Sequence, residues 1–311
     1  MGEKPKVVVI LGPTATGKTK CGVLLAQKIK GEIISGDSML VYKNMNIATA
    51  KPDAIERGGI KHHLIDILEP NGNFNVVDFK QLANEKIIAL NAKGIIPILV
   101  GGTGLYIKAL LENYNFAKSQ ASESLRLQLE NYAREKGNVA LHAKLRELDC
   151  QTADRLHCND QRRIIRAIEV ALKGEEVSQT HAKESPYDAI VFGLNMERAL
   201  LYAHINKRVD AMVEKGVFDE TRELLSQGIP KTAQAMKSIG YRQIVQYLEG
   251  EITKEICIEK IKQATRNFAK RQITWYKKMP YVHWFILQEP FAFPNYVEQM
   301  YHILEEKWQV R

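Results

Sequence analysis

The stretch that decides the fold is Lys6-Val7-Val8-Val9-Ile10-Leu11-Gly12-Pro13-Thr14-Ala15-Thr16-Gly17-Lys18-Thr19. Its first six residues are an apolar, mostly β-branched run directly before a glycine, which predicts a buried strand. The eight residues from Gly12 to Thr19 match the pattern G-x-x-x-x-G-K-[ST] at every fixed position. Apolar residues then recur at helical spacing up to Ile29, and Gly31 follows. A strand, a glycine-containing loop and a helix in this order are the context in which the pattern binds phosphate.

Such a loop binds polyphosphate mainly through its backbone. The glycines let N–H groups turn inward around phosphate oxygens, and the helix N-terminus adds positive potential. The lysine neutralises charge, and the threonine hydroxyl can reach a magnesium ion. We therefore expect the whole loop to hold a diphosphate or a nucleotide, with Mg²⁺ at Thr19: Gly12, Pro13, Thr14, Ala15, Thr16, Gly17, Lys18 and Thr19.

The rest of the chain extends the same architecture. Further strands are expected at 32–35, 95–100 and 189–194, with a helix at 77–92, so the sheet is parallel and covered by helices. We predict an α/β fold of the P-loop NTPase-like type with a helical insertion domain. Its parts are the first portion of the core at 1–114, a helical insertion at 115–186, and the continued core at 187–311, mostly helical with a basic C-terminal helix.

Composition excludes several classes of protein. The 311 residues are 45% hydrophobic and 26% charged, which is ordinary for a globular chain and excludes wholesale disorder. No apolar run approaches the roughly 18 residues of a membrane span, and the N-terminal apolar run is too short for a signal peptide, so we expect a cytoplasmic protein. The four scattered cysteines predict reduced thiols. The net charge of +8 attracts polyanions, either nucleic acid or small phosphates.

The acid beside the loop is Asp37, which follows the second strand. Kinases and ATPases usually add a strand that ends in a metal-binding Asp, but the strand at 95–100 ends in Gly101-Gly102-Thr103-Gly104. Asp37 can therefore hold metal, accept a proton from an acceptor substrate, or serve only as a turn residue or helix cap. The pair His62-His63 has no third ligand nearby in the sequence and predicts packing, not a metal site.

A series of motifs in a fixed order makes the sequence resemble the tRNA dimethylallyltransferase (tRNA isopentenyltransferase) family, bacterial type. The resemblance covers nearly the whole chain, from Val7 to about Trp284, and the combination is far more specific than the phosphate loop alone. Besides that loop, it rests on these segments: 37–42 (DSMLVY), 49–52 (TAKP), 62–66 (HHLID), 101–106 (GGTGLY), 157–169 (HCNDQRRIIRAIE), 238–243 (SIGYRQ) and 270–275 (KRQITW).

The resemblance implies transfer of a dimethylallyl group from dimethylallyl diphosphate to N6 of the adenosine 3′ of the anticodon, in tRNAs that read codons starting with U. Asp37 then matches the proposed general base, Arg208 an arginine that contacts the diphosphate, and Thr103 a threonine near the transferred group. On the residues alone, Arg208 fits a solvated arginine on a charged helix, and Thr103 fits a turn hydroxyl. The implied partners are the tRNA anticodon stem-loop and dimethylallyl diphosphate, with Mg²⁺ as cofactor and a monomeric chain.

The resemblance also implies contacts with tRNA, both by the helical insertion at 115–186 and by the core. Within the helix 254–278, Lys262, Arg266, Lys270 and Lys277 share one face at about 100° per residue, which suits phosphate contacts or plain solvation. The residues implied to bind tRNA are Asp37, Ser38, Met39, Leu40, Thr103, Arg126, Gln161, Arg162, Arg163, Ile164, Ile165, Gly240, Tyr241, Arg242, Lys270, Arg271 and Gln272.

Two other functions fit part of the sequence. A small-molecule kinase would use the loop for ATP, but it leaves the basic helix and the absent metal-binding Asp unexplained. A nucleotide-switched RNA-binding module would leave Asp37 without a role. The sequence departs from the family pattern at Leu40 and Lys237, where the family often has Met and Gln. It contains no C-x-x-C pair, so we expect no zinc-finger extension of the kind found in eukaryotic members.

Overall fold

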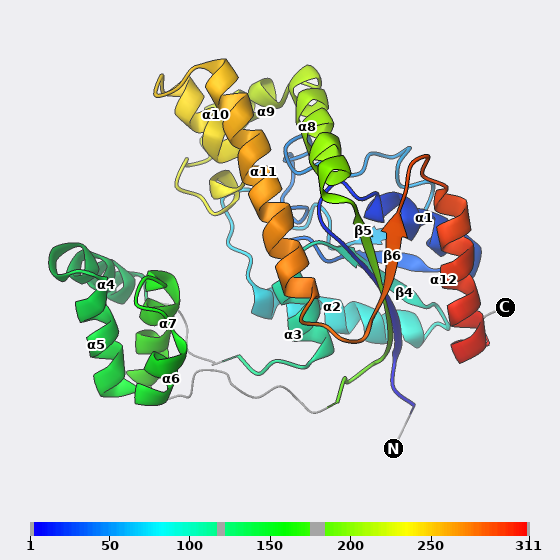
Figure 1. The fold of residues 1–311 in the computed structure, drawn as a ribbon, viewed down its shortest axis with the longest axis horizontal. Coiled ribbons are helices and arrows are strands. Elements are labelled where there is room, and N and C mark those ends of the chain that lie inside the picture. Colours follow the sequence, from blue (N-terminus) through cyan, green and yellow to red (C-terminus); the bar gives the residue numbers. More distant parts are fainter. Residues whose placement is uncertain (1–2, 117–121, 175–183, 310–311) are drawn as a thin grey trace. The chain divides into compact units, whose positions relative to one another are not determined.

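A computed structural model describes residues 3–116, 122–174 and 184–309 (Figure 1). The chain divides into two compact units, each with a hydrophobic core of its own. Unit 1 comprises Met1–Leu111 together with Glu184–Arg311, and unit 2 comprises Glu112–Lys183. None of the helices in the described ranges is both long and apolar enough to cross a membrane.

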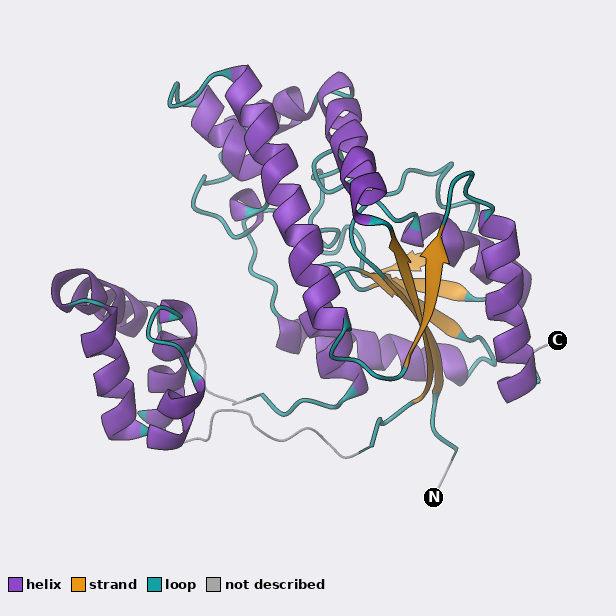
Figure 2. Cartoon of the chain, viewed as in Figure 1, coloured by secondary structure: helices purple, strands orange, loops and turns teal. Residues whose placement is uncertain are grey.

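Unit 1 is built on a six-stranded sheet in the order β3-β2-β4-β1-β5-β6, and every neighbouring pair is parallel (Figure 2). Parallel neighbours need crossover connections, and helices supply most of them. The fold class predicted from the sequence is confirmed. The strands are β1 (Lys6–Leu11), β2 (Glu32–Ser35), β3 (His62–His63), β4 (Pro97–Gly101), β5 (Asp188–Met196) and β6 (Val282–Leu287).

The two faces of the sheet bury separate cores. Val7, Val9 and Leu11 of β1 point into a core shared with helices α2 (Val76–Asn91) and α3 (Gly104–Leu111). The alternate residues Val8 and Ile10 point into a core shared with α1 (Lys18–Ile29) and α12 (Phe293–Trp308). A strand covered on both faces needs an unbroken apolar sequence, which is why β1 lacks the usual alternation.

The remaining helices of unit 1 pack around a smaller core at the end of the sheet from which the phosphate loop extends (Figure 1). Its buried residues include Val209, Phe218, Ile244, Cys257 and Ile261. The longest of these helices, α11, also reaches the first core through Tyr276. The helices are α8 (Arg198–Glu214), α9 (Val217–Ser226), α10 (Tyr241–Leu248) and α11 (Lys254–Tyr276), with a short 3₁₀ turn at Ala235–Lys237.

Unit 2 is a small helical bundle made of α4 (Glu123–Lys136), α5 (Asn138–Leu148), α6 (Cys150–Arg155) and α7 (Gln161–Ala171). Its core contains one carboxylate, Glu169, whose side chain is 1% exposed. Arg126 binds both carboxylate oxygens at 2.8 and 2.9 Å, Arg166 lies 3.4 Å away, and the Ser122 N–H donates at 3.1 Å. A buried charge with this many partners fixes α4 against α7, because removing a partner would leave the charge uncompensated.

Candidate active site

The phosphate loop closes on itself between β1 and α1. The Pro13 carbonyl accepts hydrogen bonds from Thr16 Oγ1 at 2.8 Å and from Lys18 Nζ at 2.7 Å. Gly17, immediately before α1, has φ of 77°, and a Cβ there would lie 2.4 Å from Cζ of Phe293. Only glycine satisfies both conditions, since a side chain would be strained and would also clash with α12.

The loop forms one wall of a cavity of about 540 Å³ in unit 1. Five parts of unit 1 line this cavity: the loop with the start of α1, the turn after β2, the segment that follows that turn, the carboxyl end of β4, and helices α8 and α11. Polar and charged groups in the lining include Lys18, Thr19, Asp37 and Arg208. The apolar lining includes Leu40, Ile47, Met212 and Phe268. The structure therefore brings seven of the predicted diphosphate-binding and catalytic residues around one space: Thr14, Ala15, Gly17, Lys18, Thr19, Asp37 and Arg208.

Two cations in this cavity repel each other. Burial and then the charge of Arg208 lower the pKa of Lys18 to about 7, although Asp37 acts in the opposite direction. Burial likewise lowers the pKa of Arg208, against the charges of Asp37 and Glu56. Burial makes the charged form of both side chains unfavourable, so a polyanion that enters the cavity can bind both and stabilise their positive charge. The site is built to bind a strongly negative group next to a carboxylate.

Asp37 is fixed by the backbone around it. Its Oδ1 accepts the N–H of Met39 at 2.8 Å. The N–H of Ser38, the residue between them, donates to Oγ1 of Thr103 at 3.2 Å. Thr103 also donates its own N–H to the Gly36 carbonyl at 3.4 Å. The carboxyl ends of β2 and β4 are thus tied together, and this link sets the direction in which the Asp37 side chain points.

Helix α11 holds two loops of the site through a pair of buried side chains. Gln272 accepts the Thr14 N–H at 2.9 Å and donates to the Gly102 carbonyl at 2.8 Å. The Tyr276 hydroxyl lies 2.7 Å from the same carbonyl and 3.2 Å from that of Gly12. Sequence reasoning missed this role, because a glutamine directly after the two exposed cations Lys270 and Arg271 gives no sign of burial.

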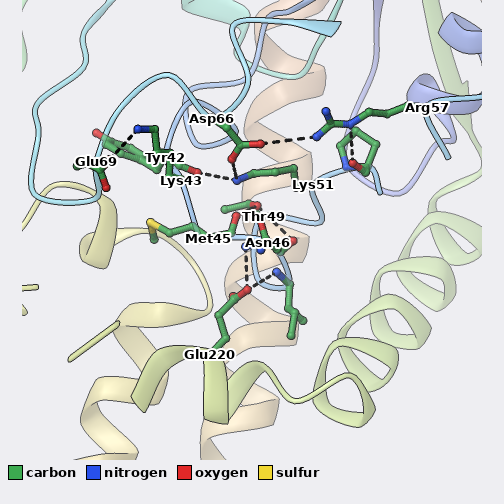
Figure 3. Close-up of polar contacts among 12 residues, drawn as sticks. Tyr42, Lys43, Met45, Asn46, Thr49, Lys51, Arg57, Asp66, Glu69 and Glu220 are labelled. Carbon is green, nitrogen blue, oxygen red and sulfur yellow. Dashed lines mark hydrogen bonds and ion pairs between the residues drawn. The ribbon is translucent and has the colours of Figure 1, made fainter. Parts of the chain in front are cut away.

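The segment from Asn46 to Asp53, which we call the wall loop, lines the cavity with most of its residues. Figure 3 shows the polar contacts that hold it. The Lys51 side chain is 4% exposed, and its Nζ lies 2.5 Å from Asp66 Oδ1 and 2.6 Å from the Tyr42 carbonyl. The segments TAKP and HHLID, separate in the sequence, are therefore joined by one ion pair.

The residues predicted to bind tRNA divide by exposure. Those whose side chains are exposed are Arg162 and Arg163 of α7, Arg242 of α10, and Lys270 and Arg271 of α11. Ser38, Met39, Leu40, Thr103 and Gln161 are partly exposed. Asp37 is also partly exposed, whereas Ile164, Ile165, Gly240, Tyr241 and Gln272 are buried and offer no surface to RNA. Arg126 is occupied by Glu169 in the core of unit 2.

Two of the four cations on the predicted basic face of α11 have partners on α8. Lys262 pairs with Asp210 at 2.7 Å, and Arg266 donates to Asn206 Oδ1 at 2.7 Å. The buried residues of α11 are Cys257, Ile261, Ala269, Gln272 and Tyr276. Phe268 and Trp275 of the same helix are half-buried: Phe268 lines the cavity, and Trp275 packs against the first core. Lys270 and Lys277 remain exposed.

The paired histidines do not form a metal site. His63 Nε2 lies 2.6 Å from Glu32 Oε2, and His62 Nδ1 lies 2.8 Å from the Ile60 carbonyl. Over the described ranges, no three His, Cys, Asp or Glu side chains converge as metal ligands. Mg²⁺ commonly keeps several waters and takes the rest of its ligands from substrate phosphates and one or two side chains. Thr19, which lines the cavity, fits a magnesium ion held in this way.

Comparison with known proteins agrees with this geometry and confirms the resemblance seen in the sequence. The sequence model of the IPP transferase family matches residues 40–279. A tRNA dimethylallyltransferase of Carboxydothermus hydrogenoformans is 48% identical over 285 residues, 90% of this chain and 91% of the relative.

Two solved structures are also similar over nearly the whole chain. The tRNA isopentenylpyrophosphate transferase of Bacillus halodurans has a TM-score of 0.74 at 42% identity, covering 98% of this chain and 99% of that one. A eukaryotic dimethylallyltransferase acting on tRNA has a TM-score of 0.79 at 26% identity, covering 97% of this chain and 80% of that one. The parallel sheet, the phosphate loop and these similarities lead to one conclusion: the chain belongs to the IPP transferase family.

Proposed function

We propose that the chain transfers a dimethylallyl group from dimethylallyl diphosphate to N6 of the adenosine 3′ of the anticodon, in tRNAs that read codons starting with U. One observation carries the proposal. The cavity places two mutually repelling cations, Lys18 and Arg208, together with the carboxylate of Asp37. A prenyl diphosphate needs the cations for its leaving group, and an amine nucleophile needs the carboxylate for its proton.

The reaction follows from these groups. Adenine N6 attacks the allylic carbon while the C–O bond to the diphosphate breaks, and the electron pair of that bond leaves on the diphosphate oxygen. The N6 proton passes to the Asp37 carboxylate, because the amine is a poor nucleophile until that proton leaves. The loop N–H groups, Lys18 and Arg208 stabilise the charge that develops on the leaving oxygen.

A magnesium ion would be held by the Thr19 hydroxyl and the oxygens of the donor itself. When bound, such an ion supplies further positive charge to the diphosphate. The chain's own cations act in the same place, with Lys18 reaching from the start of α1 and Arg208 from α8. Two elements on different sides of the cavity therefore hold the leaving group from two directions.

Exposed cations are the proposed contacts with tRNA. Arg162 and Arg163 in unit 2, and Arg242, Lys270 and Arg271 in unit 1, are exposed and free of the core pairing that occupies Arg126. An enzyme that modifies a base must take it out of its stack, and phosphate contacts on either side of the base hold the rest of the loop. We further propose that the chain acts as a monomer in the cytoplasm, since one chain supplies every group of the cavity.

A transfer assay tests the proposal. Purified protein is mixed with magnesium, labelled dimethylallyl diphosphate and unmodified tRNA that reads codons starting with U. Label in the anticodon loop, with no requirement for ATP, is the expected result. Consumption of ATP without label in the RNA would favour the small-molecule kinase instead.

A further inference from the structure

One carboxylate outside the cavity holds the backbone of the wall loop. Glu220 of α9 accepts three successive N–H groups, with Oε2 at 2.8 Å from Asn46 and 2.7 Å from Ile47, and Oε1 at 3.3 Å from Ala48 (Figure 3). Successive N–H groups that converge on one point form an anion-binding concavity. Here a side chain of the same protein occupies it.

Tyr241 fixes the carboxylate from the other side. Its side chain is buried, and its hydroxyl donates to Glu220 Oε1 at 2.5 Å. Burial and the Glu220 charge raise the pKa of Tyr241, so the phenol stays protonated and remains a donor. Gly240, with φ of 97°, lies so close to the wall loop that a Cβ there would be 2.9 Å from Cβ of Ala48. The start of α10 and the wall loop therefore pack directly together.

The wall loop has a second anchor in Lys51, held by Asp66 and the Tyr42 carbonyl. Between the two anchors lie residues that line the cavity, among them Ile47, Thr49 and Ala50. Ile47 belongs to the apolar part of the lining, whereas the phosphate loop and the cations form the polar part. None of the bonds made by Glu220 involves the phosphate loop.

We propose that Glu220, oriented by Tyr241, is a positioning residue that sets the apolar wall at Ile47 against the five-carbon group of the donor. The proposal rests on the proposed function, since it concerns the donor of that reaction. Reactive geometry tolerates only small displacements, so a wall that shifts weakens the hold on the allylic group without altering the diphosphate site. Glu220 touches neither reactant and acts through the loop.

Three variants separate this role from general stability. Glu220→Gln replaces one acceptor oxygen with a donor that faces an N–H or the phenol, and Tyr241→Phe removes only the hydroxyl. Glu223→Gln is the matched control, because Glu223 is exposed on the same helix and, within the described part of the chain, its side chain binds only Gln227. For each variant, the KM for donor, the KM for tRNA and the inhibition constant of inorganic diphosphate are measured, together with kcat and the thermal midpoint.

The KM for donor is expected to rise about tenfold in Glu220→Gln and less in Tyr241→Phe, because hydrogen bonds to a charged group that hold the wall loop are lost. The KM for tRNA and the inhibition by inorganic diphosphate are expected to stay within about twofold, because neither depends on the apolar wall. A variant that is merely less stable would lose kcat at unchanged KM. An unchanged donor KM, or an equal rise in the diphosphate inhibition constant, would overturn the proposal.

Hydrogen exchange gives a readout that does not need catalysis. The amides of Asn46, Ile47 and Ala48 are expected to exchange faster in Glu220→Gln than in wild type and in Glu223→Gln, since the glutamine keeps only one of the two acceptor oxygens. A wild-type protein that transfers no label would refute the proposed function, and exchange would still test the anchor. Equal exchange in all three proteins would refute the anchor itself.

Discussion

Replacing Gln272 with leucine tests whether α11 holds the phosphate loop in place. The change removes the acceptor of the Thr14 N–H and one of two donors to the Gly102 carbonyl. That carbonyl keeps the hydroxyl of Tyr276 at 2.7 Å, so the Thr14 N–H is the group left without a partner. A half-buried donor left unsatisfied costs about 1–3 kcal/mol.

The expected loss is therefore about 2 kcal/mol, which lowers the thermal midpoint of a unit of this size by roughly 4–8 °C. The kcat/KM for donor is expected to fall about tenfold, because the loop that holds the diphosphate loses a fixed point. Gln263→Leu on the same helix is the control, since Gln263 is exposed and bonds only to neighbours one turn away. Its midpoint and activity are expected to match wild type.

The isosteric change Gln272→Glu adds a test by pH. An ionised carboxylate still accepts the Thr14 N–H, but its other oxygen repels the Gly102 carbonyl oxygen. The protonated acid instead donates a hydrogen bond to that carbonyl, as the glutamine does. The folded state therefore raises the pKa of this Glu above its unfolded value of about 4.3. A raised pKa means that the variant gains stability as the pH falls. The difference in thermal midpoint between Gln272→Glu and wild type should therefore narrow from about pH 8 toward about pH 5. A wild-type midpoint for the leucine variant, or a gap that does not depend on pH, would refute the reasoning.

Three further predictions concern the chemistry and the RNA. Asp37→Ala should lower kcat about 10²- to 10⁴-fold in a rapid-quench assay and leave the tRNA affinity in filter binding unchanged, because a general base acts only in the reaction. Because the pKa of Lys18 is lowered to about 7, this lysine is mostly neutral above that pH, and binding of the anionic donor should protonate it. Calorimetry in buffers of different ionisation enthalpy should detect this proton uptake in wild type but not in Lys18→Arg. Lys270→Ala should reduce the salt slope of tRNA binding by about 1, whereas Lys93→Ala should not.

Each of these predictions has a clear contrary result. Wild-type turnover by Asp37→Ala would show that the carboxylate takes no part in the reaction. Equal proton uptake by wild type and Lys18→Arg would mean that the lysine is already charged before the donor binds. An unchanged salt slope for Lys270→Ala would place the tRNA backbone away from that end of α11.

The elements around the phosphate loop could be predicted because local pattern and tertiary role agree there. The strand Lys6–Leu11 and the helix Lys18–Ile29 have the expected bounds. The strand Val282–Leu287 was missed for the opposite reason. It lies at the edge of the sheet, and its outward residues Trp284 and Ile286 are apolar although 38% and 56% exposed, so no alternation marks it.

The site was predictable only in part, since the hydrogen bonds that hold its loops join residues far apart in the sequence. The loop, Asp37 and Arg208 came from the motif series, and the structure brings them around one cavity. Glu220 binds amides more than 170 positions away in the sequence, so no local pattern reveals it. Gln272 is polar and stands beside two exposed cations, yet the turn of the helix places it on the buried face with Tyr276.

The most direct test is the identity of the nucleoside that the protein makes. Unmodified tRNA is incubated with the wild-type protein, magnesium and dimethylallyl diphosphate, then digested to nucleosides and analysed by mass spectrometry, while released diphosphate is counted. The account predicts N6-dimethylallyladenosine at the position 3′ of the anticodon, with one diphosphate for each modified residue. Adenosine left unmodified at that position, or diphosphate released without modification of the RNA, would contradict it.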